Sequence, residues 1–242
     1  MDEYQQMVAA AARCGARLND GRIRRKPQFT LLYCGAGSLA LVLLGAGTRS
    51  HTTVVPTRPT AGQMRVNPPE LDLVGAMLQD ARLQDADLRG ARLGDAVLSG
   101  ANLSRADLSR ANLERAVLDG ATLEGADAPG ALLRCASARG ASLAYAHLGG
   151  VRAGQARLLE ANLTGVDLSQ ASLCVADLRN ARLVDANLTE ADLRAANLTG
   201  ADLRGANLRG ARLEGAAYDR TTRWPAGFRP EAHATVMTPI GR

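Results

Sequence analysis

The chain repeats a unit of five residues thirty times between residues 71 and 220, with no break in register (150/5 = 30). The first position of the unit is Ala in 27 cases, the third is Leu in 26 and the fifth is Gly in 13. In a helix, five residues advance by about 500°, so the leucines would be spread around the axis instead of forming one stripe. In an extended chain, residues two apart lie on the same face. The period therefore predicts short extended sides on which Ala and Leu both point inward.

The two residues after each Leu are rich in Gly, Ser, Asp and Arg, a composition that suits a turn. Each unit then forms one side and one corner, and successive turns of the chain must stack because one unit cannot bury its own apolar face. Aromatic residues are only 3% of the chain, so the core must consist of Ala, Leu and Val. Burial of one Leu stabilises a fold by about 1.5–3 kcal/mol before entropy is subtracted, and stacked leucines can hold a narrow rod together. Examples of these inward residues are Leu103, Leu108, Leu188 and Leu203.

The segments ANLSRADLSRANLERAVL (101–118) and ADLRGANLRGARLEG (201–215) resemble the pentapeptide-repeat family, whose pattern is A(D/N)LXX. The resemblance implies an all-β fold, a right-handed quadrilateral β-helix (a solenoid) with four units in each coil. Thirty units then make about 7.5 coils (30/4) over residues 71–220. With a spacing of about 4.8 Å between hydrogen-bonded strands, the rod is about 36 Å long.

Four units per coil place residues twenty apart above one another, and one outward face then carries an acidic stripe. Asp or Asn at this position is the consensus of the repeat and can bond locally to the backbone. The competing interpretation is a stripe that imitates DNA phosphates, which certain quinolone-resistance members of the family present to DNA gyrase. The residues of the stripe are Asp87, Asp107, Asp127 and Asp167.

A second outward face carries an apolar ladder of Met77, Val97 and Val117. This ladder is a candidate contact surface for a partner protein or for a second copy of the chain in a homodimer. It is equally compatible with an ordinary strand surface, because extended chains favour Val.

The array is least regular over residues 126–155, where Ala128, Ala138 and Ala153 replace inward leucines. Loss of a core Leu leaves space that must collapse or lower the stability. This segment is either tolerated variation, or a recognition patch or bend.

Both ends of an array need a cover, because an open coil exposes apolar side chains and unpaired backbone. Residues 48–70 are predicted to be a linker and N-terminal cap, and residues 221–242 a C-terminal cap or tail. Tyr218, Trp224 and Phe228 are predicted to cover the last coil, with a hook for a partner as the alternative.

Residues 29–47 form a run of 19 residues without a charge, preceded by a basic segment over 1–28. The length is enough for one transmembrane helix, and the positive charges before it predict a cytoplasmic N-terminus with the repeats outside the membrane. A cleaved signal peptide is one alternative. A start near Met64 is another, and it would leave the protein in the cytoplasm.

The sequence holds no catalytic constellation, no cofactor-binding motif and no metal-ligand spacing among its four cysteines and three histidines. The array has 17 Arg against 19 acidic residues (17 − 19 = −2), which argues against direct nucleic-acid binding. The sequence thus predicts no enzyme but an interaction rod, held at a membrane, for an unknown protein partner. The alternative function is a cytoplasmic DNA mimic that protects gyrase or another topoisomerase from inhibitors such as quinolones.

Overall fold

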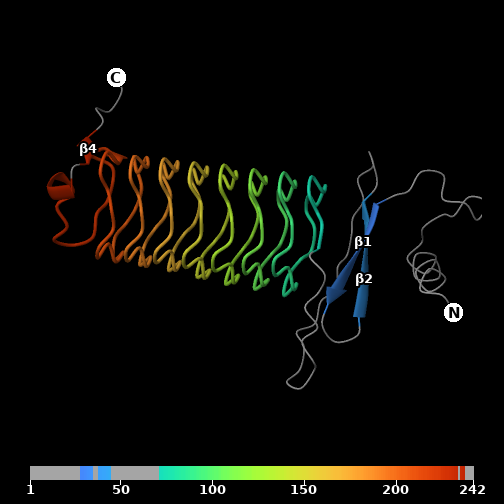
Figure 1. Ribbon diagram of the computed structural model, residues 1–242. Coiled ribbons are helices and arrows are strands. Elements are labelled where there is room, and N and C mark those ends of the chain that lie inside the picture. The colour runs from blue at the N-terminus through green and yellow to red at the C-terminus, as the bar shows by residue number, and fades with distance from the viewer. Residues whose placement is uncertain (1–27, 35–37, 45–70, 234, 238–242) are drawn as a thin grey trace, which may run out of the picture.

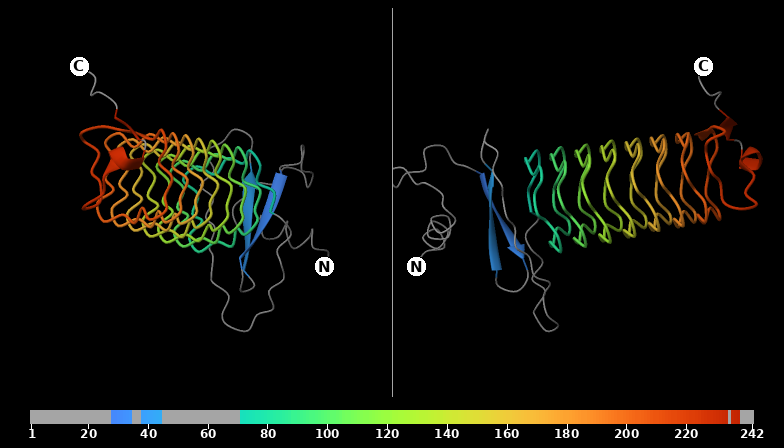
Figure 2. Two further views of the ribbon diagram at one scale, coloured as in Figure 1. Left: turned by 60° about the vertical axis from the view of Figure 1, so that its left-hand side comes forward. Right: turned by 180° about the vertical axis from the view of Figure 1, so that it is seen from behind.

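The computed structural model describes residues 28–34, 38–44, 71–233 and 235–237. From residue 71 the chain winds into stacked coils that form a rod (Figure 1). Parallel bridges join residues twenty apart, beginning with Asp72 and Arg92 and continuing to Asn197 and Ala217. Each coil therefore contains four five-residue units. Figure 2 shows from two further directions that the coils follow one another along a single axis.

Backbone hydrogen bonds tie each side to the coils before and after it. The N–H of Leu103 donates to the carbonyl of Thr122 (2.7 Å), and the N–H of Asn102 donates to the carbonyl of Ala81 (2.8 Å). The N–H of Arg105 adds a third bond, to Glu124 (2.9 Å). A short side thus satisfies most of its backbone groups through neighbouring coils, so stacking is needed to stabilise each coil.

The corners from residue 75 to residue 215 share one backbone feature, a positive φ at the fifth position of the unit. At the first corner the N–H of Ala76 donates to the carbonyl of Leu73 (3.0 Å), and Gly75 between them has φ of 67°. A positive φ at the third residue of the turn, and not at the second, is the pattern of a type II turn. The φ angle is positive at each fifth position from 75 to 215, yet only 13 of these corners hold Gly and 16 hold another residue. At those 16 corners a residue with a side chain adopts the left-handed backbone region, which is sterically unfavourable for residues other than Gly.

Val175 occupies the corner where this strain is largest, because its φ is 60° and its side chain is β-branched. The side chain is 57% exposed and contributes little burial. We expect Val175→Asn to raise the free energy of unfolding by about 0.5–1 kcal/mol, since Asn tolerates the left-handed region. Urea unfolding followed by circular dichroism measures the change. Val97→Asn, at an extended position with no positive φ, is the matched control. A gain for the control and none for Val175→Asn would contradict this interpretation of the corners.

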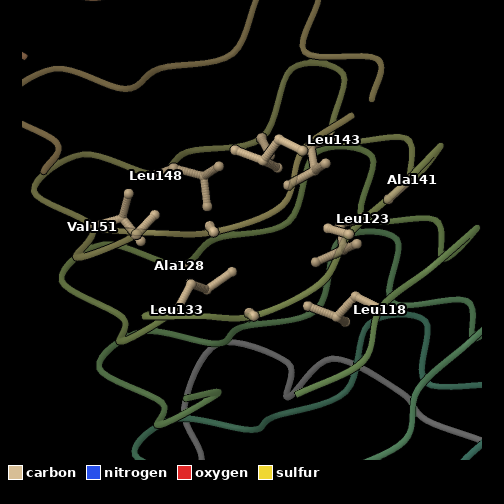
Figure 3. Close-up of a cluster of buried hydrophobic side chains, with 14 of the residues drawn as sticks. Leu118, Leu123, Ala128, Leu133, Ala141, Leu143, Leu148 and Val151 are labelled. Carbon is tan, nitrogen blue, oxygen red and sulfur yellow. The ribbon is translucent and has the colours of Figure 1, made fainter. Parts of the chain in front are cut away.

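The core consists of the first and third residues of each unit, as the period predicts. Leu103, Leu108, Leu188 and Leu203 each have 0% of their surface exposed. Figure 3 shows such side chains from different sides of the coil pointing into the interior of the rod. The rod is therefore filled along its axis by Leu and Ala.

The three alanines that replace leucines are buried too, and two of them border a gap in the packing. Ala138 and Ala153 line a cavity of about 20 Å³ together with leucines that include Leu143 and Leu163. The volume is enough for one water molecule, but the lining is apolar and offers no hydrogen-bond partner. The gap is a packing defect in the middle of the array.

The end of the array departs from strict repetition. Asp202 bridges Arg223, which is 21 residues away, so one residue is inserted between Tyr218 and this bridge. Trp224 follows Arg223 just as Leu203 follows Asp202. Trp224 therefore occupies the inward position that a further repeat would fill with Leu.

An aromatic cluster packs on this last coil. The rings of Tyr218 and Trp224 meet edge to face (5.7 Å), those of Trp224 and Phe228 stack (5.0 Å), and that of Phe228 stacks on His233 (4.7 Å). Trp224 and Phe228 pack against the core. The indole N–H of Trp224 is buried and finds no hydrogen-bond partner among the described residues. The predicted cap residues thus lie together at the end of the rod.

Two short elements complete this end. The 3₁₀-helix η1 spans Pro230–His233, and strand β4 (Val236–Met237) pairs in parallel with strand β3 (Ala217–Tyr218). Figure 1 shows β4 beside the last coil. The chain therefore adds one strand to part of the edge that the final coil leaves open.

Within 29–47, where the sequence predicts one helix, the described residues form two strands. Strands β1 (Gln28–Cys34) and β2 (Ser38–Leu44) pair antiparallel, with Cys34 opposite Ser38. The composition accounts for the difference, because Gly35 and Gly37 weaken a helix while Phe, Thr, Tyr and Val favour strands. No helix in the described part of the chain is long and apolar enough to cross a membrane. Apart from Gln28, the predicted basic segment 1–28 and linker 48–70 lie outside the described residues, as does Met64.

Candidate interaction surfaces

The acidic stripe lies on one face, where Asp87 bridges Asp107 and Asp107 bridges Asp127, but His147 separates Asp127 from Asp167. Its first carboxylates lie against a guanidinium. Arg89 pairs with Asp87 (2.5 Å) and approaches Asp107 (Nε–Oδ2, 3.7 Å). Asp107 also accepts a hydrogen bond from the backbone N–H of Ser109 (3.0 Å). This end of the stripe is therefore partly neutralised.

The rest of the stripe is also engaged by neighbouring groups. The ring nitrogen Nδ1 of His147 lies 2.7 Å from Oδ1 of Asp127. Asp167 accepts hydrogen bonds from the amide of Asn187 (2.9 Å) and the backbone N–H of Ser169 (3.0 Å). Carboxylates that bond to their own turn and to the next coil fit the local role of the consensus residue. They do not form a free line of negative charge like a DNA backbone.

Arginine and aspartate pair elsewhere on the rod in two regular ways that sequence reasoning missed. Within one side, Arg194 donates two hydrogen bonds to the carboxylate of Asp192, from Nε (2.8 Å) and from Nη2 (2.6 Å). Between coils, Arg115 donates two hydrogen bonds to the carboxylate of Asp95, from Nε (2.7 Å) and from Nη2 (2.6 Å). The Arg194 guanidinium holds the pKa of Asp192 well below its usual range. The tripeptide Asp-Leu-Arg is the sequence signal for the first kind of pair, which recurs at Asp87, Asp177 and Asp202.

The apolar ladder is only partly open to solvent. Met77 is 59% exposed, whereas Val97 and Val117 are half-buried. Met77 bridges Val97 and Val97 bridges Val117, and the next residues on this side are Ser137 and Arg157. The ladder therefore ends where the irregular middle of the array begins.

Four exposed arginines, the arginine patch, lie within or next to the irregular segment 126–155, on two adjacent sides of the rod. The patch consists of Arg134, Arg139, Arg152 and Arg157. Beside the patch, Sγ of the exposed Cys135 lies 3.7 Å from Oε1 of Gln155. Sequence reasoning noted the irregularity of this segment but not its arginines.

No catalytic or metal centre is found among the described residues. They contain no group of three or more His, Cys, Asp or Glu side chains that could hold a metal ion. Cys135 and Cys174 form no disulfide within the part of the chain that the structure describes, and burial raises the pKa of Cys174. The small apolar cavity lacks the polar groups that a substrate site needs. The chemistry of the described part of the chain therefore lies in its outward side chains.

Comparison with protein families gives a match to the model described as pentapeptide repeats, with 8 copies. The matched residues are 69–95, 96–134, 139–174, 156–194 and 176–215. No curated protein sequence matches the chain.

Several solved structures are similar to parts of the chain. HetL, involved in heterocyst differentiation regulation in the cyanobacterium Nostoc sp. strain PCC 7120, is 38% identical over 61% of this chain and 72% of its own, with a TM-score of 0.34. The pentapeptide repeat protein alr5209, from Nostoc PCC 7120, is 34% identical over 57% of this chain and 84% of its own (TM-score 0.22). QnrB1, a plasmid-mediated fluoroquinolone resistance protein, is 19% identical over 69% of this chain and 84% of its own (TM-score 0.43). At these TM-scores none of the three similarities carries a conclusion about function.

Proposed function

Because the chain belongs to the pentapeptide-repeat family, we propose that it is a non-enzymatic rod whose outward side chains bind a partner protein. Proteins of this family form right-handed quadrilateral β-helices, and we assign the same hand to this rod. The observation that carries the proposal is the filled interior. Leucine and alanine occupy the axis of the described array, and the cavity of about 20 Å³ has no room for a substrate. Function is thereby left to the four outer sides.

Co-purification at defined stoichiometry tests this proposal. The tagged full chain is cross-linked mildly in cells and purified, and the proteins bound to it are quantified by mass spectrometry. We expect one protein at a constant molar ratio to the rod, and reciprocal purification of that protein should return the chain. If no protein keeps a fixed ratio across preparations, the interaction rod is contradicted.

The DNA mimic remains the alternative function, motivated by the acidic stripe. Its carboxylates are held by Arg89, His147 and Asn187, which weakens the resemblance to a phosphate backbone. A gyrase supercoiling assay with and without a quinolone decides the matter. Protection of gyrase by the full chain would favour the mimic over the partner-binding rod.

A membrane location for the rod stays part of the proposal, motivated by the uncharged run 29–47. Fusions after residue 242 test it, one to a phosphatase that is active only outside the cytoplasm and one to a fluorescent protein that is active only inside. Phosphatase activity with a dark fluorescent fusion supports export of the repeats. The opposite pattern contradicts it.

A further inference from the structure

The arginine patch lies in the longest stretch of the array that has no acidic residue. Residues 128–159 contain four arginines and neither Asp nor Glu, whereas the whole array has 17 Arg against 19 acids. Positive charge is thus concentrated in the middle of the array, because the rest of the array has 13 Arg against 19 acidic residues (13 − 19 = −6).

The coil geometry brings the four arginines onto two adjacent sides of successive coils. Arg152 bridges Leu132, and Arg157 bridges Ser137. Arg134 and Arg139 follow two residues after these bridge partners, at the corners of the same two sides. All four side chains are exposed. The patch is therefore two coils high, or about 5–10 Å along the rod.

None of the four arginines makes an ion pair within the described residues, in contrast to many others on the rod. Two neighbouring acids are already engaged. Asp119 accepts hydrogen bonds from the hydroxyl of Ser137 (2.6 Å) and the backbone N–H of Arg139 (2.9 Å). The hydrogen bond from Arg179 (2.7 Å) lowers the pKa of Asp177, and the nearby charge of Arg139 adds to this effect. The guanidinium groups of the patch thus keep hydrogen-bond donors for carboxylates from outside the chain, for which their planar fork is well suited.

The surroundings of the patch favour a short acidic segment over nucleic acid. Duplex DNA carries one negative charge per about 1.7 Å and would continue along the rod beyond the patch. It would then meet Glu114 and Asp119 on one side, and Glu160 and Asp177 on the other. A peptide with three or four carboxylates needs no such extension. The half-buried Leu132 and Leu159 offer it apolar contacts between the charges.

We propose that Arg134, Arg139, Arg152 and Arg157 form a docking site for a short acidic segment of a partner protein. The site rests on the proposed function, since it names the chemistry of the partner that the rod binds. Apolar side chains in that segment lie against Leu132 and Leu159.

Peptide binding to the full chain tests the site. The probe is a fluorescein-labelled peptide, Gly-Glu-Leu-Glu-Asp-Leu-Glu-Gly, measured by fluorescence anisotropy at low salt. We expect the double variant Arg152→Gln/Arg157→Gln to bind it about tenfold more weakly than the unchanged protein. The matched control is Arg82→Gln/Arg182→Gln, which removes two exposed arginines from the same position of the repeat on another side. It loses the same charge, and its affinity should change less than about twofold.

Three outcomes would overturn the site. One is equal affinity of all three proteins for the peptide, and another is equal affinity for the peptide with Gln in place of every acid. The third is tighter binding of a twelve-base-pair DNA duplex that also depends on Arg152 and Arg157, which would assign the patch to nucleic acid. If the peptide test fails while co-purification still returns a partner at fixed ratio, the rod stands and only the site is wrong.

Discussion

We expect Leu163→Ala to lower the free energy of unfolding by about 3–5 kcal/mol, because the side chain is fully buried and borders an existing gap. Ala at this position joins the new space to the cavity beside Ala138 and Ala153. The surrounding coils are tied to one another by backbone hydrogen bonds and can close only part of that space. The loss therefore combines lost burial with an enlarged cavity.

Urea unfolding of the full chain, followed by circular dichroism, measures this loss. Leu159→Ala is the matched control, because Leu159 points outward at a corner and is only half-buried. The control should lose less than about 1 kcal/mol. Similar losses for the two variants would mean that the inward leucines do not hold the rod together.

We expect Asp219→Ala to lower the free energy of unfolding by about 2–4 kcal/mol, because this carboxylate organises the last corner. It is 8% exposed and accepts hydrogen bonds from the backbone N–H groups of Thr221 (2.9 Å), Thr222 (3.0 Å) and Gly200 (3.2 Å). The hydroxyl of Thr222 in turn donates to the carbonyl of Leu198 in the previous coil (2.9 Å). Ala leaves these groups without their acceptor and loosens the aromatic cap.

Asp219→Asn is the matched control, because its amide oxygen keeps one acceptor at the same place. It should lose less stability than Asp219→Ala at pH 7. Equal losses in the two variants would contradict the hydrogen-bonding role of Asp219.

The pH dependence adds a second test of Asp219. Burial raises the pKa of Asp219, but the hydrogen bonds from Thr221, Gly200 and Thr222 lower it more, so it lies below its ordinary value. The stabilisation is therefore complete above the unfolded pKa of about 3.9 and is lost as the pH falls through the lower folded pKa. The difference in the free energy of unfolding between the unchanged protein and Asp219→Asn should shrink as the pH falls from 5 through the folded pKa of Asp219. Urea unfolding curves at several pH values measure it.

The coil could be predicted from the sequence because five-residue spacing leaves few ways to bury both Ala and Leu. Leu103 and Leu188 lie inside because of their place in the repeat, and no long-range information is needed to find that place. The family resemblance supplied the four units per coil, and this number correctly placed Asp87 beside Asp107 and Met77 beside Val97.

The functional surface could not be predicted to the same depth, because outward side chains are not constrained by the period. Asp107 is an acidic residue in the sequence, but only the structure shows Arg89 and Ser109 beside it. The arginine patch likewise arises from residues 18 and 23 apart, Arg134 with Arg152 and Arg134 with Arg157, which meet only after the chain has completed a coil.

Two local features also lay beyond the pattern. An uncharged run such as 29–47 satisfies the length rule for a membrane helix, but length does not distinguish a helix from paired strands. At the other end, the single inserted residue between Tyr218 and Arg223 changes the register. That insertion makes Asp219 and Thr222 structural residues of the cap, a role that the repeat itself does not indicate.

The most direct test of the account is photo-crosslinking from each of the four sides of one coil in cells. A photoreactive amino acid replaces, one at a time, the second residue of four consecutive units. These residues are Leu132, Ser137, Ser142 and His147. If the arginine patch is the docking site, we expect a crosslinked partner from Leu132 and Ser137, which lie on the sides of the patch, and none from Ser142 and His147. Equal yields from all four sides, or no crosslinked product from any of them, would contradict it.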